Sequence, residues 1–367
     1  MNTTLAQTAL HDWHVAHGGR MVDFAGWSMP VQYSSIVAEH KATRAAAGLF
    51  DISHMGRLRF QGAGARAFLD GLVTRRVSDE KVGGVRYSLV TNEAGGILDD
   101  VLVYHVGSTG SDTSYYMMIV NASNRRKIVE WIEPRRHGSA DVRFADITGD
   151  WSMIAAQGPR AITLVQPLVD APLADMKYYT CTECTTDGSR CVTSRTGYTG
   201  EDGFELIVES ENAARIWQKL VDAGATPAAL GCRDTLRLEA AMPLYGHELS
   251  EDINPYQAGL GFAVNLEDRR FPGRDALARF KDDPNQPKRV GLEFDGKRVP
   301  REGFTVVADD RKVGTITSGT FSPTLNKPIA MAYVDSDVAA PGTELLVDIR
   351  GRDEPARVVL LPFYRRK

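Results

Sequence analysis

The chain has 367 residues, of which 43% are hydrophobic and 25% are charged. This composition is typical of globular proteins and excludes a disordered, collagen-like or low-complexity chain, and the length suits two or three domains of about 150 residues each. The formal net charge is −4. Proteins that bind a nucleic-acid backbone usually contain a strongly basic domain, so the charge does not suggest this function.

The N-terminal sequence and the cysteine content indicate where the protein works. Residues 1–19 lack the cationic start and apolar run of a signal peptide and the Arg-rich pattern of a transit peptide. No segment approaches the roughly 18 apolar residues that cross a bilayer. The 4 cysteines fit a reducing compartment better than a disulfide scaffold. We therefore expect a cytoplasmic protein that does not contact the membrane.

Two helices are predicted near the N-terminus. The first spans Leu5–His17, where Gly18 and Gly19 end it, and the second runs from an N-cap at Ser35 to Gly48. Histidines recur at every third position of the first helix without a carboxylate partner nearby, so we expect them at the surface. These positions are His11, His14 and His17.

Residues 55–147 have the pattern of a small α+β unit. Its strands come mostly as adjacent pairs, which favours an antiparallel sheet over a doubly wound parallel one. The predicted strands are Arg57–Phe60, Arg86–Val90, Val101–His105 and Tyr115–Val120, and the predicted helices are Ala65–Leu72 and Arg125–Ile132.

A glycine-rich turn inside this unit matches a dinucleotide-binding fingerprint. Gly62–Ala67 has the pattern G-x-G-x-x-A between a strand and a helix. The fingerprint needs a buried parallel first strand, whereas Arg57–Phe60 alternates charged and apolar side chains, as a half-solvated antiparallel strand does. The favoured interpretation is a strand-to-helix turn that binds no cofactor.

The second half of the chain is mixed at first and then all β. Within residues 151–286, a hairpin turn is predicted at Asp187–Ser189 and helices over Ala213–Ala223 and Asp234–Ala241. Lys281–Lys288 is polar and twice interrupted by Pro, which is typical of a linker. Short strand-like runs separated by Gly turns then predict a β domain. These runs are Val290–Phe294, Thr305–Val307, Val313–Thr317, Ile329–Val334, Glu344–Ile349 and Ala356–Leu361.

Three cysteines on the predicted hairpin raise the question of a metal. A structural zinc site normally needs four ligands at paired spacings, and no fourth Cys or His lies close in sequence to Cys181, Cys184 and Cys191. Cysteines on hairpin strands pack equally well without a metal, so we predict no metal site. Whether these thiols have any role stays open.

Two adjacent acids follow Gly95 and Gly96 and lead into an apolar β run. Neighbouring strand residues point to opposite faces, so Asp99 and Asp100 cannot share one environment. One is expected to be a turn or surface acid, and the other to point into a cleft. A half-buried carboxylate there suits general acid–base work or stabilisation of a developing cation. The alternative is a hairpin whose acids only hydrogen-bond the turn.

The segment Ser194–Leu206 carries glycines that let the backbone turn tightly or approach a flat ligand. Tyr198 is suited to stacking on such a ligand, and Glu205 to accepting two hydrogen bonds from an amino-pyrimidine edge. In the following segment Arg233 is expected at a loop-to-helix boundary, where it suits a ligand carboxylate or a pair with Glu205. A structural salt bridge would explain Arg233 equally well.

Several motifs occur in a fixed order along essentially the whole chain. They are Met21–Pro30, Phe50–Met55, Gly95–Asp100, Gln157–Pro159, Arg195–Glu205, Gly231–Ala240, Leu244–Gly246 and Ser318–Leu325. The ordered set resembles the aminomethyltransferase, or T-protein, family of the glycine cleavage system, although no single motif would be specific.

The resemblance implies an α+β fold with three domains in a cloverleaf around a central channel for tetrahydrofolate. A discontinuous, folate-binding first domain would comprise residues 1–53 and 147–280. Residues 54–146 would form a ferredoxin-like antiparallel unit that carries the catalytic aspartate. After a linker at 281–288, residues 289–367 would form a β-barrel-like domain.

The resemblance also implies a reaction and its residues. The family transfers the aminomethyl group from the lipoyl arm of the H carrier protein to tetrahydrofolate, giving 5,10-methylenetetrahydrofolate and ammonia without a metal. Asp100 is the implied catalytic acid, which would stabilise positive charge as ammonia departs. Glu205 would hold the pterin edge, with Tyr198 beside it. The other implied folate contacts are Arg233, Tyr245, Asn121, Tyr87 and Tyr364.

Two other functions stay open at this point. One is a folate-dependent demethylase that acts on a free small amine or sulfonium compound. The other is a folate-binding protein without catalysis, against which the joint presence of Asp100, Glu205 and Arg233 argues. The sequence leaves the oligomeric state, the face that docks the carrier protein and the preferred folate polyglutamate length undetermined.

Overall fold

A computed structural model describes residues 4–107, 114–137 and 141–366. These residues divide into two compact units. The first comprises residues 1–88, 100–197 and 201–233, and the second comprises residues 89–99, 198–200 and 234–367, in both cases within the described ranges. The fold is α+β, as predicted, and the domain limits inferred from the family resemblance stay a prediction.

The N-terminal helix is shorter than expected. Helix α1 spans His11–Ala16, so the predicted start at Leu5 is wrong. The backbone of Ala6 is used elsewhere: its N–H donates to the Gly26 carbonyl (2.9 Å) and its carbonyl accepts from Ser28 N (2.8 Å). A backbone group that pairs with a strand cannot also close a helical turn. The strands of this hairpin are β1 (Met21–Phe24) and β2 (Trp27–Pro30).

The second helix, α2, spans Ile36–Ala45 and confirms the predicted N-cap, because Ser35 Oγ accepts from Ala38 N at 3.2 Å. Gly48 does not end this helix but begins strand β3 (Gly48–Asp51). A Cβ at Gly48 would lie 2.1 Å from Thr43 Oγ1, so the close approach of strand and helix requires glycine here.

His14 is fully buried, and the prediction of a surface side chain is wrong for this residue. Its Nε2 lies 3.0 Å from Asp51 Oδ2, and Tyr33 Oη lies 2.7 Å from its Nδ1. Burial raises the pKa of Asp51, but the hydrogen bond and charge of His14, helped by Ser53 and Thr8, outweigh burial and bring that pKa down to about 2. The partner was missed because it lies far away in sequence.

The largest sheet of the first unit has the strand order β10-β11-β12-β9-β3-β13. All its pairings are antiparallel except the short parallel contact of β13 with β3. Helices α5 and α6 pack on it and bury Trp217 and Leu164 against Phe204 and Leu206. The further elements are β9 (Trp151–Gln157), α5 (Ala161–Val165), β10 (Cys181–Thr186), β11 (Ser189–Ser194), β12 (Gly203–Glu209), α6 (Ser210–Asp222) and β13 (Thr226–Pro227).

The predicted hairpin in this sheet is confirmed. Asp187 and Gly188 connect β10 to β11, and both have positive φ angles, 50° and 78°. Two positive φ angles are the signature of a type I′ turn, whose twist matches that of the flanking strands.

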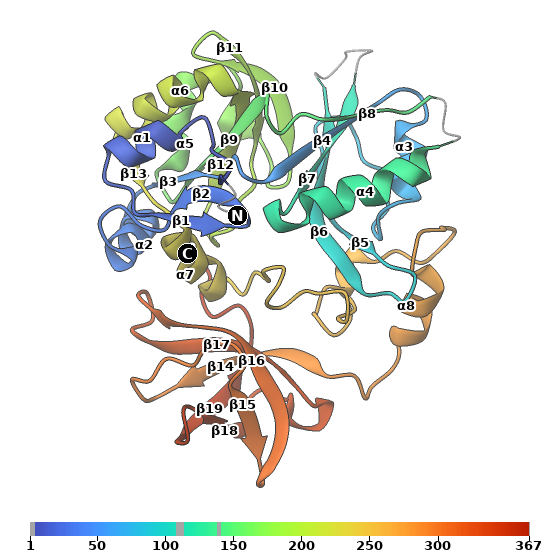
Figure 1. The fold of residues 1–367 in the computed structure, drawn as a ribbon, viewed down its shortest axis with the longest axis vertical. Coiled ribbons are helices and arrows are strands. Elements are labelled where there is room, and N and C mark those ends of the chain that lie inside the picture. Colours follow the sequence, from blue (N-terminus) through green and yellow to red (C-terminus); the bar gives the residue numbers. More distant parts are fainter. Residues whose placement is uncertain (1–3, 108–113, 138–140, 367) are drawn as a thin grey trace. The chain divides into compact units, whose positions relative to one another are not determined.

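The predicted antiparallel sheet is confirmed as well. Its strand order is β5-β6-β7-β4-β8, and the pairings of β4 with β7 and β8 and of β6 with β7 are antiparallel. Helix α4 lies over one face of it (Figure 1), where Ile128 and Ile132 are buried. The elements are β4 (Gly56–Gln61), α3 (Ala65–Asp70), β5 (Val85–Thr91), β6 (Ile97–Val106), β7 (Tyr115–Val120), α4 (Arg125–Arg136) and β8 (Arg143–Asp146).

Two expectations about this sheet are wrong. Strand β4 is not half-solvated: Arg57 is fully buried, and its Nη2 donates to the carbonyls of Ser53 (2.9 Å) and Thr148 (2.6 Å). Asp99 is neither a turn residue nor a surface acid, because β6 already begins at Ile97 and Asp99 is fully buried within it. Both expectations assumed that a charged side chain is exposed, whereas Arg57 and Asp99 are both buried in the folded chain.

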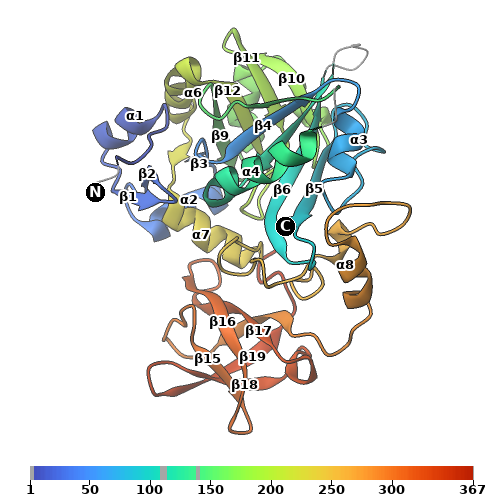
Figure 2. The ribbon, with the colours of Figure 1, turned by 45° about the vertical axis from the view of Figure 1, so that its right-hand side comes forward.

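A closed barrel is the main feature of the second unit, which confirms the predicted C-terminal β domain. Six strands in the order β14-β17-β16-β15-β18-β19 close on themselves through the pairing of β14 with β19 (orange to red in Figure 2). Their inward side chains form one apolar core. The strands are β14 (Lys288–Phe294), β15 (Thr305–Ala308), β16 (Arg311–Ser322), β17 (Lys327–Val334), β18 (Glu344–Asp348) and β19 (Asp353–Val359).

Helix α7 spans Leu230–Glu239, four residues earlier than the predicted start at Asp234, and α8 spans Arg274–Phe280. Arg233 therefore lies inside the first turn of α7 and not at a loop-to-helix boundary. Single 3-10 turns occur at Ala122–Asn124, Gln166–Leu168, Leu173–Asp175, Gly261–Ala263 and Ser336–Val338. Within the described ranges, none of the helices has the length and apolar character needed to span a membrane.

Candidate functional site

Asp100 is held by two side chains from neighbouring strands of the five-stranded sheet. Its Oδ1 accepts from Asn121 Nδ2 at 2.7 Å, and its Oδ2 accepts from Tyr87 Oη at 3.1 Å. Tyr87 lies on β5 and Asn121 directly follows β7, so the sheet order places both beside Asp100 on β6. Three residues predicted separately from the sequence thus form one cluster.

The environment of Asp100 changes its acidity. Burial raises the pKa of this carboxyl, and the hydrogen bonds from Asn121 and Tyr87 oppose that rise without cancelling it. The residue as a whole is partly exposed to solvent. A carboxyl that is fixed in position, reachable and less acidic than usual is suited to accept a proton or to face a developing cation.

Glu205 lies on β12 and is 6% exposed. Its Oε2 accepts from Thr196 Oγ1 at 2.5 Å and from Tyr104 Oη at 3.3 Å, and Ser194 Oγ lies 2.7 Å from the same Thr196 hydroxyl. Among the described residues no hydrogen bond reaches the other oxygen, Oε1. The hydroxyls therefore fix the carboxylate and leave one acceptor atom for a ligand.

Strand β6 connects these two carboxylates. Asp100 and Tyr104 are four residues apart on β6, so they point to the same face, with α-carbons about 13 Å apart. Tyr104 reaches Glu205, whereas Asp100 is bound by Tyr87 and Asn121. Strand β6 therefore carries both Asp100 and the tyrosine that holds Glu205.

Tyr179 was missed by the sequence analysis and belongs to the same region. Burial raises its pKa, and the charges of Glu205 and Asp100 act in the same direction, so the phenol lies within electrostatic reach of both carboxylates. Its φ of 63° is in the left-handed region, which non-glycine residues rarely adopt. The only signal in the sequence is the pair Tyr178-Tyr179 just before a strand, which is not specific.

Arg233 lies in the first turn of α7. Its charge acts on His54, which belongs to the Phe50–Met55 motif. Burial lowers the pKa of His54 to about 4; the charge of Asp51 opposes this, while those of Arg233 and Arg57 add to it. His54 is thus a neutral, buried imidazole within the electrostatic field of Arg233, and its Nδ1 has no hydrogen-bond partner within the described residues.

The remaining candidates lie in the second unit, close to the end of α7. Tyr198 Oη donates to the Pro243 carbonyl at 2.5 Å, and Tyr245 Oη donates to the Ile97 carbonyl at 3.2 Å. Tyr364 is tied to α7 because its N–H donates to the Glu239 carbonyl at 2.8 Å. The unit therefore gathers the three tyrosines that the sequence pointed to.

Gly200 explains how the Tyr198 segment reaches the end of α7. Its φ is 79°, and a Cβ placed on it would lie 2.9 Å from Ala240 Cβ and 3.7 Å from Tyr364 Cδ1. Glycine is needed here both for the left-handed backbone and for the close packing.

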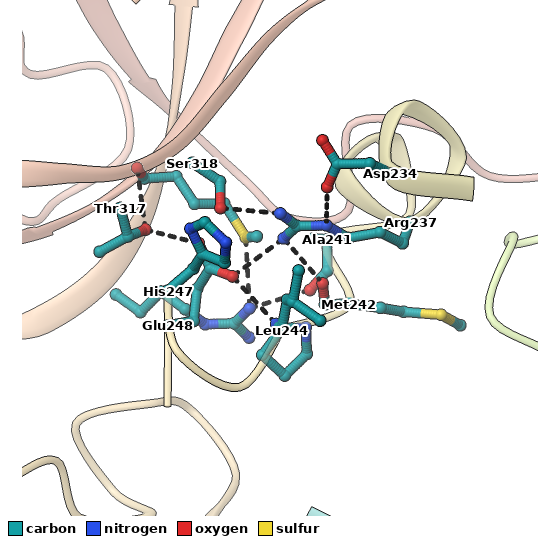
Figure 3. Close-up of polar contacts among 12 residues, drawn as sticks. Asp234, Arg237, Ala241, Met242, Leu244, His247, Glu248, Thr317 and Ser318 are labelled. Atoms are coloured by element: carbon teal, nitrogen blue, oxygen red, sulfur yellow. Dashed lines mark hydrogen bonds and ion pairs between the residues drawn. The ribbon is translucent and has the colours of Figure 1, made fainter. Parts of the chain in front are cut away.

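A buried ion pair fixes the loop that carries Tyr245 (Figure 3). Arg237 Nη1 lies 2.9 Å from Glu248 Oε2, and the two side chains are 2% and 0% exposed. The same Glu248 carboxylate accepts from Leu244 N (3.0 Å) and from Thr317 Oγ1 (2.6 Å) on β16. The loop is therefore joined to α7 and to the barrel through one carboxylate.

Known protein families and relatives match nearly the whole length of the chain. The GCVT N-terminal domain family matches residues 10–268, and the glycine cleavage T-protein C-terminal barrel domain family matches residues 288–365. A protein of Saccharopolyspora erythraea named aminomethyltransferase is 45% identical over 366 residues, covering 98% of both chains. One of Rubrobacter xylanophilus with the same name is 46% identical, covering 99% of this chain and 95% of the relative.

A solved structure agrees with the sequence relatives. The crystal structure of the glycine cleavage system aminomethyltransferase T from Bartonella henselae superposes with a TM-score of 0.91 at 32% identity and covers 98% of each chain. The family matches, the relatives and this structure confirm the resemblance drawn from the ordered motifs. The chain belongs to the glycine cleavage T-protein family.

Proposed function

We propose that the chain is the aminomethyltransferase of a glycine cleavage system. It transfers the aminomethyl group from the lipoyl arm of a lipoylated H carrier protein to tetrahydrofolate and releases ammonia. Full-length similarity to relatives of that name supports this function, and nothing in the comparisons favours a demethylase or a non-catalytic folate-binding protein. The 4 cysteines, all free thiols, accord with the cytoplasmic location that is part of the proposal.

The reaction balances without a redox step. The transferred carbon loses its bonds to the lipoyl sulfur and to the amino nitrogen and gains bonds to N5 and N10 of the folate. The two protons that N5 and N10 give up are the ones that ammonia and the lipoyl thiol gain. The protein must therefore move protons from the folate nitrogens to the amino nitrogen and the lipoyl sulfur. It must also stabilise the cation that forms on the carbon after its old bonds break and before its new bonds form.

Asp100 is the group to which we assign this work. Tyr87 and Asn121 hold the carboxylate in one orientation, so no reorganisation is needed when positive charge develops opposite it. Its raised pKa brings the carboxyl closer to the range in which it can take up and return a proton. The assignment of Asp100 thus rests on one observation: its carboxyl group is fixed by two hydrogen bonds and has a raised pKa.

Glu205 is the group to which we assign the pterin. Hydroxyls fix one of its oxygens, and the other is available to an N–H donor of an amino-pyrimidine ring. Further contacts with the folate are proposed for residues identified from the family resemblance. These are Tyr87, Asn121, Tyr198, Arg233, Tyr245 and Tyr364.

The test is a reconstituted reaction with aminomethylated H carrier protein and tetrahydrofolate. Formation of both methylenetetrahydrofolate and ammonia, dependent on this chain, is expected. Asp100→Asn should lower the turnover rate by about 10²-fold or more while tetrahydrofolate binding persists. Asp222→Asn, the same change at an exposed position on α6, should leave the rate unaltered. A rate within a few-fold of wild type for Asp100→Asn would refute the role of Asp100. Absence of both products despite folate binding would refute the proposed function.

A further inference from the structure

Two cysteines face each other across the hairpin of β10 and β11. Cys184 is paired directly with Cys191 in the antiparallel register. Directly opposed residues in such a pair project to the same face, with α-carbons about 4.5–5.5 Å apart. A disulfide requires an α-carbon separation of about 4.4–6.8 Å, so this register satisfies the distance without any backbone movement.

The sulfur atoms converge on a common neighbour. Thr193 Oγ1 lies 3.1 Å from Cys184 Sγ and 3.4 Å from Cys191 Sγ. Both cysteines are free thiols, and they differ in access: Cys184 is partly exposed, whereas Cys191 is 2% exposed. Cys184 is thus the member of the pair that is more exposed to solvent, and Cys191 lies in the core.

The third cysteine of the hairpin cannot take part. Cys181 and Cys184 are three residues apart on one strand, so they point to opposite faces, with α-carbons about 10 Å apart. That separation exceeds the limit of about 7 Å for a disulfide. Cys181 Sγ instead lies near the carbonyls of Gly84 (4.0 Å) and His105 (3.9 Å). The Cys-x-x-Cys spacing is therefore misleading, and the relevant pair is Cys184 with Cys191.

We propose that Cys184 and Cys191 form a reversible dithiol–disulfide site that reacts with low-molecular-weight disulfides such as glutathione disulfide. The Cys184 thiolate attacks one sulfur of the oxidant, which releases one thiol and leaves a mixed disulfide on Cys184. Cys191 then gives up its proton and attacks the Cys184 sulfur, which releases the second thiol. The two protein thiols are oxidised, and one external disulfide is reduced to two thiols. This inference does not depend on the proposed function.

The electrostatics support this order of events. A hydrogen bond from Cys191 is the largest cause that lowers the pKa of Cys184. The same hydrogen bond, together with burial, raises the pKa of Cys191 well above that of an ordinary thiol. The more exposed sulfur is thus the better thiolate and attacks first, as in other thiol–disulfide exchange.

Peptide mapping tests the proposal on the full chain. Trypsin cleaves after Lys177, Arg190 and Arg195, which separates Cys184 in peptide 178–190 from Cys191 in peptide 191–195. After treatment with glutathione disulfide and blocking of free thiols, these two peptides should appear linked by mass spectrometry, and dithiothreitol should separate them. Cys181→Ser removes the other thiol of peptide 178–190 and should leave the link intact.

Two further variants complete the design. Cys184→Ser and Cys191→Ser should each abolish the link, and in Cys191→Ser a stable glutathione adduct should remain on Cys184. Four outcomes in wild type would overturn the proposal: both thiols left reduced, a persistent glutathione adduct on Cys184, a link that includes Cys181 or Cys232, or a link between two chains. In wild type, fragmentation of the linked peptides distinguishes Cys181 from Cys184, and a non-reducing gel detects a link between two chains, so a variant that fails to fold leaves the test valid.

Discussion

The pKa values of two carboxyl groups, Asp100 and Asp51, shift in opposite directions in this protein. Burial raises the pKa of Asp100, where the two hydrogen-bond donors are neutral side chains. At Asp51 the same effect of burial is outweighed, because His14 contributes both a hydrogen bond and a positive charge. A neutral partner orients a carboxylate without greatly favouring its charge, whereas a charged partner does both.

The low pKa of Asp51 predicts a loss of stability in acid. Its folded-state value of about 2 lies below its ordinary value, so the carboxylate stabilises the fold fully above that ordinary value and loses this effect as pH falls toward 2. The whole contribution is about 2 kcal/mol. The difference in unfolding free energy between wild type and Asp51→Asn should shrink by about 1 kcal/mol from pH 5 to pH 3 in urea titrations. The same difference at pH 5 and at pH 3 would contradict this account of Asp51.

The free oxygen of Glu205 predicts a defect in ligand binding. Glu205→Gln keeps the shape of the side chain but replaces a charged acceptor, so tetrahydrofolate affinity measured by calorimetry should fall by about 1–3 kcal/mol. Glu209→Gln, on the same strand, alters only an exposed pair with Arg190 and is the matched control. If Glu205→Gln binds tetrahydrofolate as wild type does, Glu205 is not part of the folate site.

At the scale of elements, the loop after α7 depends on one buried ion pair. Arg237 keeps its charge and Glu248 has a lowered pKa, because the attraction between them outweighs burial. Breaking such a pair leaves an uncompensated buried charge, which costs more than the intact pair contributes. The network of Figure 3 therefore acts mainly by holding the backbone of Leu244 in place beside Tyr245.

Single and double replacement of this pair should differ in a characteristic way. Glu248→Gln should lower the unfolding free energy by about 3–5 kcal/mol in urea titrations, because Arg237 stays charged and buried. The double variant Arg237→Met with Glu248→Leu should cost less than this single change. The exposed pair of Arg357 and Glu344 offers a control, since Glu344→Gln should change stability by less than about 1 kcal/mol. A double variant less stable than Glu248→Gln would contradict this account.

Local patterns predicted most strands of the five-stranded sheet and of the barrel, but they missed β3, β9 and β12 of the largest sheet and the buried polar partners. Strand β7 occupies the predicted residues, and alternation with turn residues found all six barrel strands within a few positions. The partners of His14 and Glu248 could not be predicted, because each lies in another element brought close only by folding. Tyr179 was missed for a related reason: its position follows from a left-handed backbone that no neighbouring residue type demands.

At the scale of the whole molecule, the family was accessible from the sequence because its motifs are spread over the full chain. The matched families span residues 10–268 and 288–365, which include all eight predicted site residues. The structure adds how these residues are held. Asp100 could be singled out by its motif, but its two hydrogen-bond donors come from β5 and from the end of β7, and only the sheet order brings them to β6.

Strand β6 also limits how this protein can change its length. Inserting one residue between Asp100 and Tyr104 would turn one of the two side chains to the opposite face of the sheet, so one carboxylate would lose its surroundings. Inserting two residues would keep the face but lengthen the spacing by about 7 Å. The five residues from Asp100 to Tyr104 therefore set a fixed span between the catalytic candidate and the tyrosine that holds Glu205.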